Sequence, residues 1–370
     1  MYQLETFILD IPTIRPHKMS VATMQKQTLV LVKITSAEGI VGWGEATTIG
    51  GLSYGEESPE SIKTNLDMYF APSLTSISGE MNIAQITQML NKNIIGNRFA
   101  KCAVQTALFD IWGKKLGLPV SELLGGRMRD SLPVLWVLAS GDTDKDIAEA
   151  KQMIDSGRHN IFKLKIGSKA VEEDVAHAVA IKKALGRDVS IRVDVNRAWS
   201  KMQCIKGIQA LQDGGIDLIE QPCAIFDTEL LKYLTDRFDV AIMADEAVMA
   251  PQNAYTLAKN RCADVFAVKI EQAGGLVEAC DIGKIATFAG IDLYGGTMLE
   301  GAVGTIASAH VFSTFESLAY GTELFAPLLL TEEILKTPLA YENFELKVPK
   351  GAGLGIEPDE EKISALTRHS

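Results

Sequence analysis

Short apolar runs alternate with helical stretches along the chain after about residue 130. Each run ends in polar or charged residues, and the ends of the middle runs lie 24 to 29 residues apart, the length of one strand, one helix and two loops. The runs cover 134–138, 162–166, 190–195, 217–220, 241–245, 265–270 and 291–294, and an eighth is expected near 317–322. Eight such units predict a (β/α)₈-type barrel. An open doubly wound sheet shares the alternation, but eight units exceed its usual size.

The first third of the chain has a different order of elements. Residues 3–11, 27–35 and 40–46 predict strands, with a hairpin turn at 36–39. Helical stretches follow, and Gly117 marks the end of one of them. Strands followed by helices are typical of an α+β domain.

These patterns predict three parts. Residues 1–130 form the α+β domain, 131–330 form the barrel, and 331–370 form a C-terminal segment. That segment contains one more strand-like run, 344–348, which has no partner in the barrel rhythm and is expected to return to the first domain.

Composition narrows the possible functions. The 370 residues carry a net charge of −11, which argues against a nucleic-acid or anionic-membrane surface. The five cysteines include no CxxC pair, so we expect neither a disulfide framework nor a cysteine zinc site. The first residues do not resemble a signal peptide, and there is no run of 18 apolar residues, so we expect a cytoplasmic protein.

Carboxylates end three successive runs. Asp194, Glu220 and Asp245 are expected at one rim of the barrel, where catalytic groups lie in this architecture. Three converging carboxylates repel one another unless a cation lies between them, and ligands with only oxygen donors favour Mg²⁺ or Mn²⁺ over zinc. Glu246 alternates to the other face and is expected to orient its neighbours.

Lysines end the flanking runs. Lys163 and Lys165 are two apart on one strand and therefore share a face, the barrel interior, while Lys269 faces the same cavity from the far side. Two neighbouring buried lysines should each disfavour the other's charge. A lysine that can lose its proton is a usable base, and a protonated one is a usable acid.

Other candidates are weaker. Glu323 lies at the end of the eighth run and is expected to reach the site. The glycine-rich segment 294–304 lacks the Lys-Ser/Thr ending of a phosphate loop, so we expect it to let the backbone approach a ligand. His17, taken alone, is expected to be a solvated loop residue.

Together these motifs carry a family resemblance. KxK, D-x-N, EQP, ADE and the lysine of the sixth run resemble the muconate-lactonizing subgroup of the enolase superfamily, in which a lysine acts as the base. The similarity extends over nearly the whole chain, in the segments DIPTIRPHK, GEATTIGGLSYGEESPE, ELLGGR, LASGD, FKLKIG, IDLIEQP, LYGGTMLEG, GTELF and PLLLTEE. Val137 and Ala326 are small departures that bear on substrate preference.

The resemblance implies a fold and a set of roles. The fold is a modified TIM-like barrel capped by the first domain, which acts as a lid. One Mn²⁺ or Mg²⁺ is held by the three carboxylates, and Lys165 is the acid/base, with Lys163, Lys269 and Glu323 around it. The segment 48–54, with Ile49 and Tyr54, covers the substrate, as the segment 17–20 is expected to do, and Asn196 of the D-x-N motif contacts it. The oligomer expected from the family is an octamer.

The resemblance also implies a reaction, the reversible lactonization of cis,cis-muconate in catechol breakdown. Three alternatives share the fold: chloromuconate cycloisomerase, o-succinylbenzoate synthase and N-acylamino-acid racemase. The lid segment GEATTIGGLSYGEES favours the muconate reaction. A non-catalytic assembly protein with this fold would have no reason to keep the carboxylates and three lysines.

Overall fold

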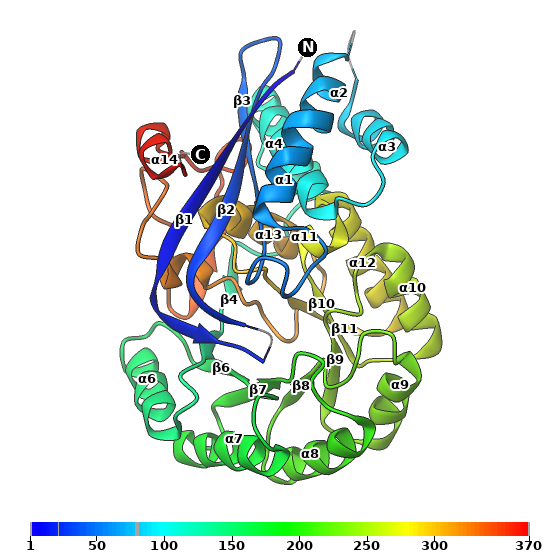
Figure 1. The fold of residues 1–370 in the computed structure, drawn as a ribbon, viewed down its shortest axis with the longest axis vertical. Coiled ribbons are helices and arrows are strands. Elements are labelled where there is room, and N and C mark those ends of the chain that lie inside the picture. Colours follow the sequence, from blue (N-terminus) through cyan, green and yellow to red (C-terminus); the bar gives the residue numbers. More distant parts are fainter. Residues whose placement is uncertain (1, 21, 78–80, 369–370) are drawn as a thin grey trace.

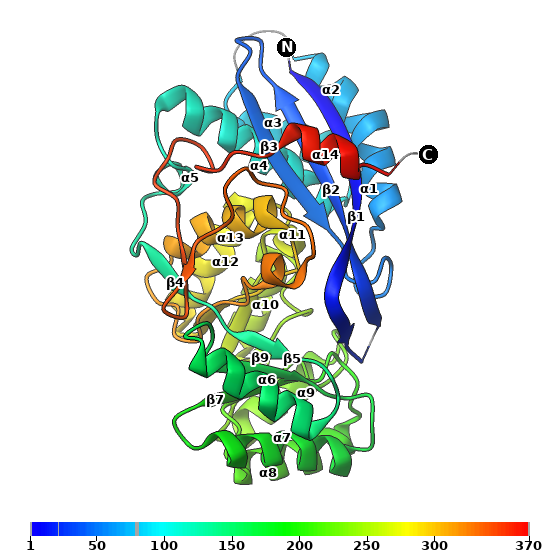
Figure 2. The same ribbon diagram turned by 90° about the vertical axis from the view of Figure 1, so that its left-hand side faces the viewer.

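The structure is a computed structural model, and it describes residues 2–20, 22–77 and 81–368. Its first part contains an antiparallel sheet in the order β1-β2-β3, formed by β1 (Gln3–Lys18), β2 (Thr23–Thr35) and β3 (Val41–Thr47). The three strands predicted here are confirmed, but the first two are longer than predicted. Their register shifts between Pro12 and His17, after which pairing resumes. The extended hairpin reaches from this domain toward the barrel (Figures 1 and 2).

Helix α4 packs across this sheet because two glycines of β3 allow close approach. A Cβ atom at Gly42 would lie 2.1 Å from the carbonyl oxygen of Ala107, and one at Gly44 would lie 1.9 Å from that of Ala103. Gly117 ends α4 in the left-handed conformation, as predicted. The helices of this domain are α1 (Pro59–Asn65), the π-helical turn η1 (Leu66–Phe70), α2 (Ala71–Thr75), α3 (Ile83–Asn93), α4 (Arg98–Leu116) and α5 (Val120–Leu123).

The second part is a curled parallel sheet, with seven strands in the described residues, in the order β11-β10-β9-β8-β7-β6-β5. The strands are β5 (Trp136–Leu138), β6 (Ile161–Lys165), β7 (Ser190–Asp194), β8 (Leu218–Glu220), β9 (Ala241–Ala244), β10 (Val265–Val268) and β11 (Asp292–Gly295). The predicted eighth strand at 317–322 does not form as such. Instead Thr322 makes single parallel bridges to Gly295 and Val134, and so occupies the gap between β11 and β5.

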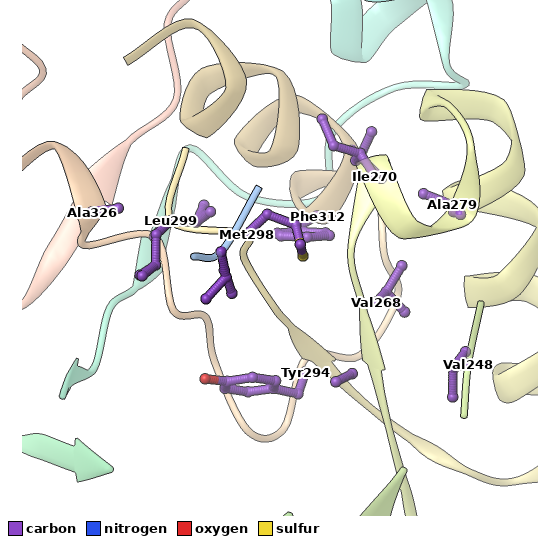
Figure 3. Close-up of a cluster of buried hydrophobic side chains, with 14 of the residues drawn as sticks. Val248, Val268, Ile270, Ala279, Tyr294, Met298, Leu299, Phe312 and Ala326 are labelled. Atoms are coloured by element: carbon purple, nitrogen blue, oxygen red, sulfur yellow. The ribbon is translucent and has the colours of Figure 1, made fainter. Parts of the chain in front are cut away.

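Helices cover the outside of this sheet (Figure 1). Buried apolar side chains of β10, β11 and α13 gather at its edge, among them Val268, Tyr294 and Phe312 (Figure 3). The helices are α6 (Thr143–Asp155), α7 (Val171–Leu185), α8 (Lys201–Asp213), α9 (Thr228–Arg237), α10 (Pro251–Asn260), α11 (Ile270–Ala273), α12 (Leu276–Ala289), α13 (Ala302–Ser313) and the 3₁₀ turn η2 (Ala326–Leu329).

The C-terminal segment contributes to both parts. The predicted strand at 344–348 forms as β13 (Glu345–Lys347), but it pairs with β4 (Ser131–Pro133) and β12 (Tyr341–Glu342), not with the first sheet. The expectation of a return to the first domain is therefore wrong for this strand. The final helix, α14 (Glu360–Leu366), does lead back to β1, where Thr367 bridges to Leu9.

Two expectations from composition can be compared with the described ranges. The five cysteines, all inside those ranges, are buried and free of disulfide bonds. Across residues 2–20, 22–77 and 81–368, no helix combines the length and apolar character that a membrane crossing requires.

Candidate functional site

A cavity lies at the carboxyl ends of the barrel strands, where the β1–β2 hairpin and the segment after β3 cover them. It contains about 320 Å³ of space not filled by protein, including its mouth. Side chains from both parts of the chain line it: His17, Met19, Ile49, Tyr54, Lys165, Asn196, Glu220, Asp245, Lys269, Thr297, Leu299 and Glu323. Eight of these are residues predicted from the sequence; the other two predicted residues, Lys163 and Asp194, lie fully buried directly behind the wall.

Three buried carboxylates occupy successive strand ends. Asp194 ends β7, Glu220 ends β8 and Asp245 follows β9, and each is at most 1% exposed. Burial, followed by the negative charge of Asp194, raises the pKa of Glu220 well above its ordinary value. Burial also opposes the charge of Asp194, but the neighbouring lysines outweigh it and lower the pKa of that carboxyl.

Each of these carboxylates is paired with a lysine. Lys165 Nζ lies 2.6 Å from Asp194 Oδ2, Lys163 Nζ lies 2.8 Å from Glu220 Oε2, and Lys269 Nζ lies 2.7 Å from Asp245 Oδ2. Lys163 opposes the charge of Lys165, as expected. Burial also lowers the pKa values of both lysines, but the carboxylates outweigh these effects and the net shift is upward.

Lys163 connects two sides of the barrel. Its ammonium group also donates to Glu323 Oε2 at 2.7 Å, and the hydroxyl of Tyr294 donates to the same oxygen at 3.2 Å. Lys163 and Tyr294 are both fully buried. Lys163 thus fixes Glu220 and Glu323 from behind the cavity, while Lys165 presents its ammonium group within the wall.

The first domain completes the site through Tyr54. Its hydroxyl donates to Asp245 Oδ2 at 2.9 Å and accepts from Lys269 Nζ at 2.6 Å. The Lys269 ammonium also lies 4.6 Å from the centre of the Tyr54 ring, within range of a cation–π contact. Tyr54, which was expected to cover the substrate, is thus also in direct contact with the carboxylate cluster.

Asn196 and Arg197 continue the wall beyond β7 in left-handed backbone conformations, with φ values of 45° and 68°. The side-chain amide of Asn196 donates to Asp194 Oδ2 at 3.1 Å and to Glu246 Oε1 at 3.4 Å. Arg197 Nε lies 3.2 Å from the same oxygen of Glu246. Glu246, which was expected to orient its neighbours, therefore contacts both of these residues.

His17 is the clearest residue that the sequence pattern misplaced. It is fully buried on β1, opposite Met24, and not in a solvated loop. Neither ring nitrogen has a hydrogen-bond partner among the described residues. Burial, with the nearby charges of Lys165, Arg15 and Lys163, lowers its pKa well below the ordinary value, so the ring is neutral. Prolines at 12 and 16 interrupt the alternation that would have marked this strand.

Met19 also lines the cavity and belongs to the segment 17–20, which the resemblance placed over the substrate, whereas Thr297 and Leu299 were not singled out. Thr297 and Leu299 belong to the glycine-rich segment 294–304, which was expected to approach a ligand through its backbone. In the structure, these two residues of the segment line the cavity.

The donor set is chemically suited to a hard divalent cation. It offers buried oxygen atoms on three carboxylates, and both Asp245 Oδ1 and Asn196 Oδ1 lack a hydrogen-bond partner within the described residues. As the side chains stand, no group of three or more His, Cys, Asp or Glu in the described ranges is placed to enclose a metal. One oxygen of each carboxylate points to a lysine instead. The residues therefore fit a divalent cation by charge and donor type.

Comparison with known proteins covers almost the whole chain. Residues 3–125 match the family model of the mandelate racemase / muconate lactonizing enzyme N-terminal domain, and residues 145–362 match the enolase C-terminal domain-like model. Muconate cycloisomerase 1 of Acinetobacter baylyi is 69% identical over 370 residues, covering 100% of both chains. A chloromuconate cycloisomerase of Cupriavidus necator is 40% identical over 365 residues, covering 99% of this chain and 98% of its own.

Solved structures agree with this pattern. The crystal structure of muconate lactonizing enzyme from Pseudomonas fluorescens complexed with muconolactone superposes with a TM-score of 0.96 at 53% sequence identity. The match covers 99% of this chain and 98% of that one.

Proposed function

Since this chain belongs to the mandelate racemase / muconate lactonizing enzyme family of the enolase superfamily, we propose that it catalyses the reversible lactonization of cis,cis-muconate to muconolactone. The observation that carries the proposal is a 69% identity over the full length of a muconate cycloisomerase. The cavity agrees with it, because three lysines line or underlie a small site suited to a compact dianion.

Membership of this family implies a divalent metal cofactor. We propose Asp194, Glu220 and Asp245 as its ligands and Mn²⁺ or Mg²⁺ as the ion, because the donors are all oxygen. When bound, such an ion supplies fixed positive charge that stabilises negative charge developing on a neighbouring carboxylate.

The residues of the chain supply the remaining steps. One carboxylate of the substrate adds to the conjugated double bond, forming the ring C–O bond while electron density moves toward the other carboxylate. Lys165 then donates a proton to the carbon next to that second carboxylate, and in the reverse direction it removes the proton. The position of Lys165 suits this role, because it lines the cavity while its ammonium group is held by Asp194.

The surrounding groups have supporting roles in this proposal. Lys163 and Glu323 fix the position of Glu220, and Lys269 provides positive charge across the cavity from Lys165. Ile49, Tyr54 and Asn196 contact the substrate, and the first domain excludes water from the strand ends.

Chloromuconate cycloisomerase is an alternative, but the likeness to the Cupriavidus necator enzyme of that name is weaker, at 40% identity. The synthase and racemase reactions differ in needing Lys269 as a second acid or base. The octameric assembly and cytoplasmic location stay predictions from the sequence.

The test is ultraviolet absorbance of cis,cis-muconate with the purified protein and Mn²⁺. We expect the absorbance of the conjugated diene to fall, and the loss to stop when a chelator is added. Unchanged absorbance at saturating Mn²⁺ would overturn the proposed reaction, and turnover that persists after complete removal of metal would overturn the cofactor assignment.

A further inference from the structure

The loop between β11 and α13 forms one wall of the cavity. Its residues Thr297 and Leu299 line the site, although Leu299 has a φ of 63°, a left-handed conformation that is uncommon for leucine. Within the loop, the Leu299 N–H donates to the Thr297 hydroxyl at 2.9 Å, and that hydroxyl donates to Glu300. Other contacts must help to hold this backbone, because a left-handed leucine is unfavourable by itself.

The first domain provides such contacts from two strands of its sheet. Gln27 of β2 donates its side-chain amide to the carbonyl oxygens of Met298 at 3.1 Å and Leu299 at 3.0 Å. Glu45 of β3 accepts the backbone N–H groups of Gly301 and Gly304, the latter at 2.9 Å. Both side chains are at most 2% exposed. They therefore bind the loop and the first turn of α13 from across the domain boundary; Figure 3 shows Met298 and Leu299 in this loop.

The first turn of α13 has space for this carboxylate because it contains glycines. A Cβ atom at Gly301 would lie 2.6 Å from Leu29 Cδ1 and 3.1 Å from Glu45 Oε1. One at Gly304 would lie 2.7 Å from the Cβ of Glu300 and 3.4 Å from the Cδ of Glu45. N–H groups in the first turn of a helix lack partners within the helix, so a carboxylate placed there satisfies them.

We propose that Glu45 is a positioning residue for the reaction, which fixes the Thr297–Leu299 wall of the substrate cavity from the first domain. The proposal rests on the proposed function. Glu45 lies on β3, four residues before Ile49 of the covering segment. Glu45 thus joins the strand that leads into the covering segment to Gly301 and Gly304, which follow the Thr297–Leu299 wall directly in the chain. The first domain shapes the cavity through this wall as well as through its own lining residues.

Glu45→Gln tests the role, because an amide keeps the size but has only one acceptor oxygen for two N–H groups. We expect KM for cis,cis-muconate to rise about tenfold, and the ratio of kcat/KM between muconate and a substituted muconate to change, while kcat changes little. Asp110→Asn is the matched control. Asp110 is also a buried carboxylate of the first domain that accepts backbone N–H groups, from Trp43 at 3.0 Å and Leu354 at 2.8 Å, but it does not contact the loop.

Gly304→Ala tests the same contact from the barrel side. It adds one methyl group against Glu300 and Glu45 and should shift KM and the selectivity ratio in the same direction, so it decides the question if Glu45→Gln fails to fold. Unchanged KM and selectivity in a folded variant, or the same change in Asp110→Asn, would overturn the positioning role. A wild type without muconate turnover would overturn the proposed function, whereas an active wild type beside an unaffected variant overturns only this inference.

Discussion

Tyr54 donates its hydroxyl to the carboxylate of Asp245 across the domain boundary, over a separation of 191 residues. The same hydroxyl accepts a hydrogen bond from Lys269. The segment that covers the cavity is therefore joined to one of the proposed metal ligands by a direct contact. Closure of the first domain and arrangement of the carboxylates are physically linked at this point.

Because of this contact, substitutions at Ile49 and Tyr54 of the covering segment should have different effects. Ile49→Ala should change the ratio of kcat/KM between muconate and substituted muconates, because it removes buried apolar surface from the wall, and leave Mn²⁺ affinity unchanged. Tyr54→Phe should also weaken Mn²⁺ binding, by about tenfold, since hydrogen bonds to metal ligands orient them. Titration of Mn²⁺ into both variants measures these affinities. An equal Mn²⁺ affinity in Ile49→Ala and Tyr54→Phe would show that the Tyr54 contact has no effect on the metal ligands.

The ligand assignment predicts loss of both metal and activity. Asp194→Asn, Glu220→Gln and Asp245→Asn each remove a negative charge next to the cation, so we expect turnover to fall at least about a hundredfold and Mn²⁺ affinity to fall with it. Asp264→Asn is the control, because Asp264 accepts the N–H of Ile242 near the opposite ends of the strands. A ligand variant with normal activity at low Mn²⁺ would remove that residue from the set.

Lys165→Ala should stop proton transfer and leave most substrate binding intact. A positioned acid or base is worth about 10²–10⁴-fold in rate. Incubation of the lactone in D₂O measures the step directly, with Lys169→Ala as a control for loss of a nearby, exposed lysine. If deuterium still enters next to the carboxylate at the wild-type rate, another residue is the base.

Lys269 distinguishes a cycloisomerase from a racemase. Its ammonium group lies between Asp245 and Tyr54. A cycloisomerase delivers one proton to one carbon, so beside Lys165 it needs only the charge of this lysine. Lys269→Arg keeps that charge but does not readily lose a proton, and it should retain more activity than Lys269→Met. The two turnover rates should be compared alongside a crystal structure of the Arg variant. Equal, near-complete loss with an undisturbed site would show that Lys269 transfers a proton.

A pH prediction follows from the buried carboxyl of Glu45. Burial raises its pKa from 4.5 to about 7, with a further contribution from Glu300. The folded state therefore binds this proton more tightly than the unfolded chain, and the stabilisation, full below the ordinary pKa, is lost as the pH rises through about 7.

The wild type should accordingly lose its advantage over Glu45→Gln as pH rises. Between about pH 5 and pH 8 the gap in free energy of unfolding should shrink by on the order of 2 kcal/mol. Urea denaturation of both proteins at the two pH values measures the gap. A gap that grows with pH would show that Glu45 is ionised in the fold.

The ends of the strands could be predicted from the sequence, but the contacts between separate elements could not. The regular spacing placed Asp194, Glu220 and Asp245 at one rim, because the polar residue that follows each apolar run marks the end of a strand. The absence of the predicted eighth strand could not be foreseen from the sequence. Thr322 makes single bridges to its two neighbours there, and no run of paired residues forms.

The contacts within the site join residues far apart in the sequence, so local sequence patterns could not predict them. The pairing of Lys163 with Glu220 and Glu323 spans 57 and 160 residues, and it reverses the pKa shift expected from two adjacent lysines. His17 was misplaced because a register shift in the hairpin, between Pro12 and His17, obscured its strand.

The two residues that follow helix α14 contact β1, the first strand of the chain. Thr367 bridges to Leu9, the N–H of Arg368 donates to the carbonyl of Ile8, and its guanidinium binds the Asp10 carboxylate at 2.8 Å. During synthesis, β1 therefore leaves the ribosome shortly before its partner β2 but long before Thr367 and Arg368. These last contacts of the first domain can form only after the residues of the barrel have been made.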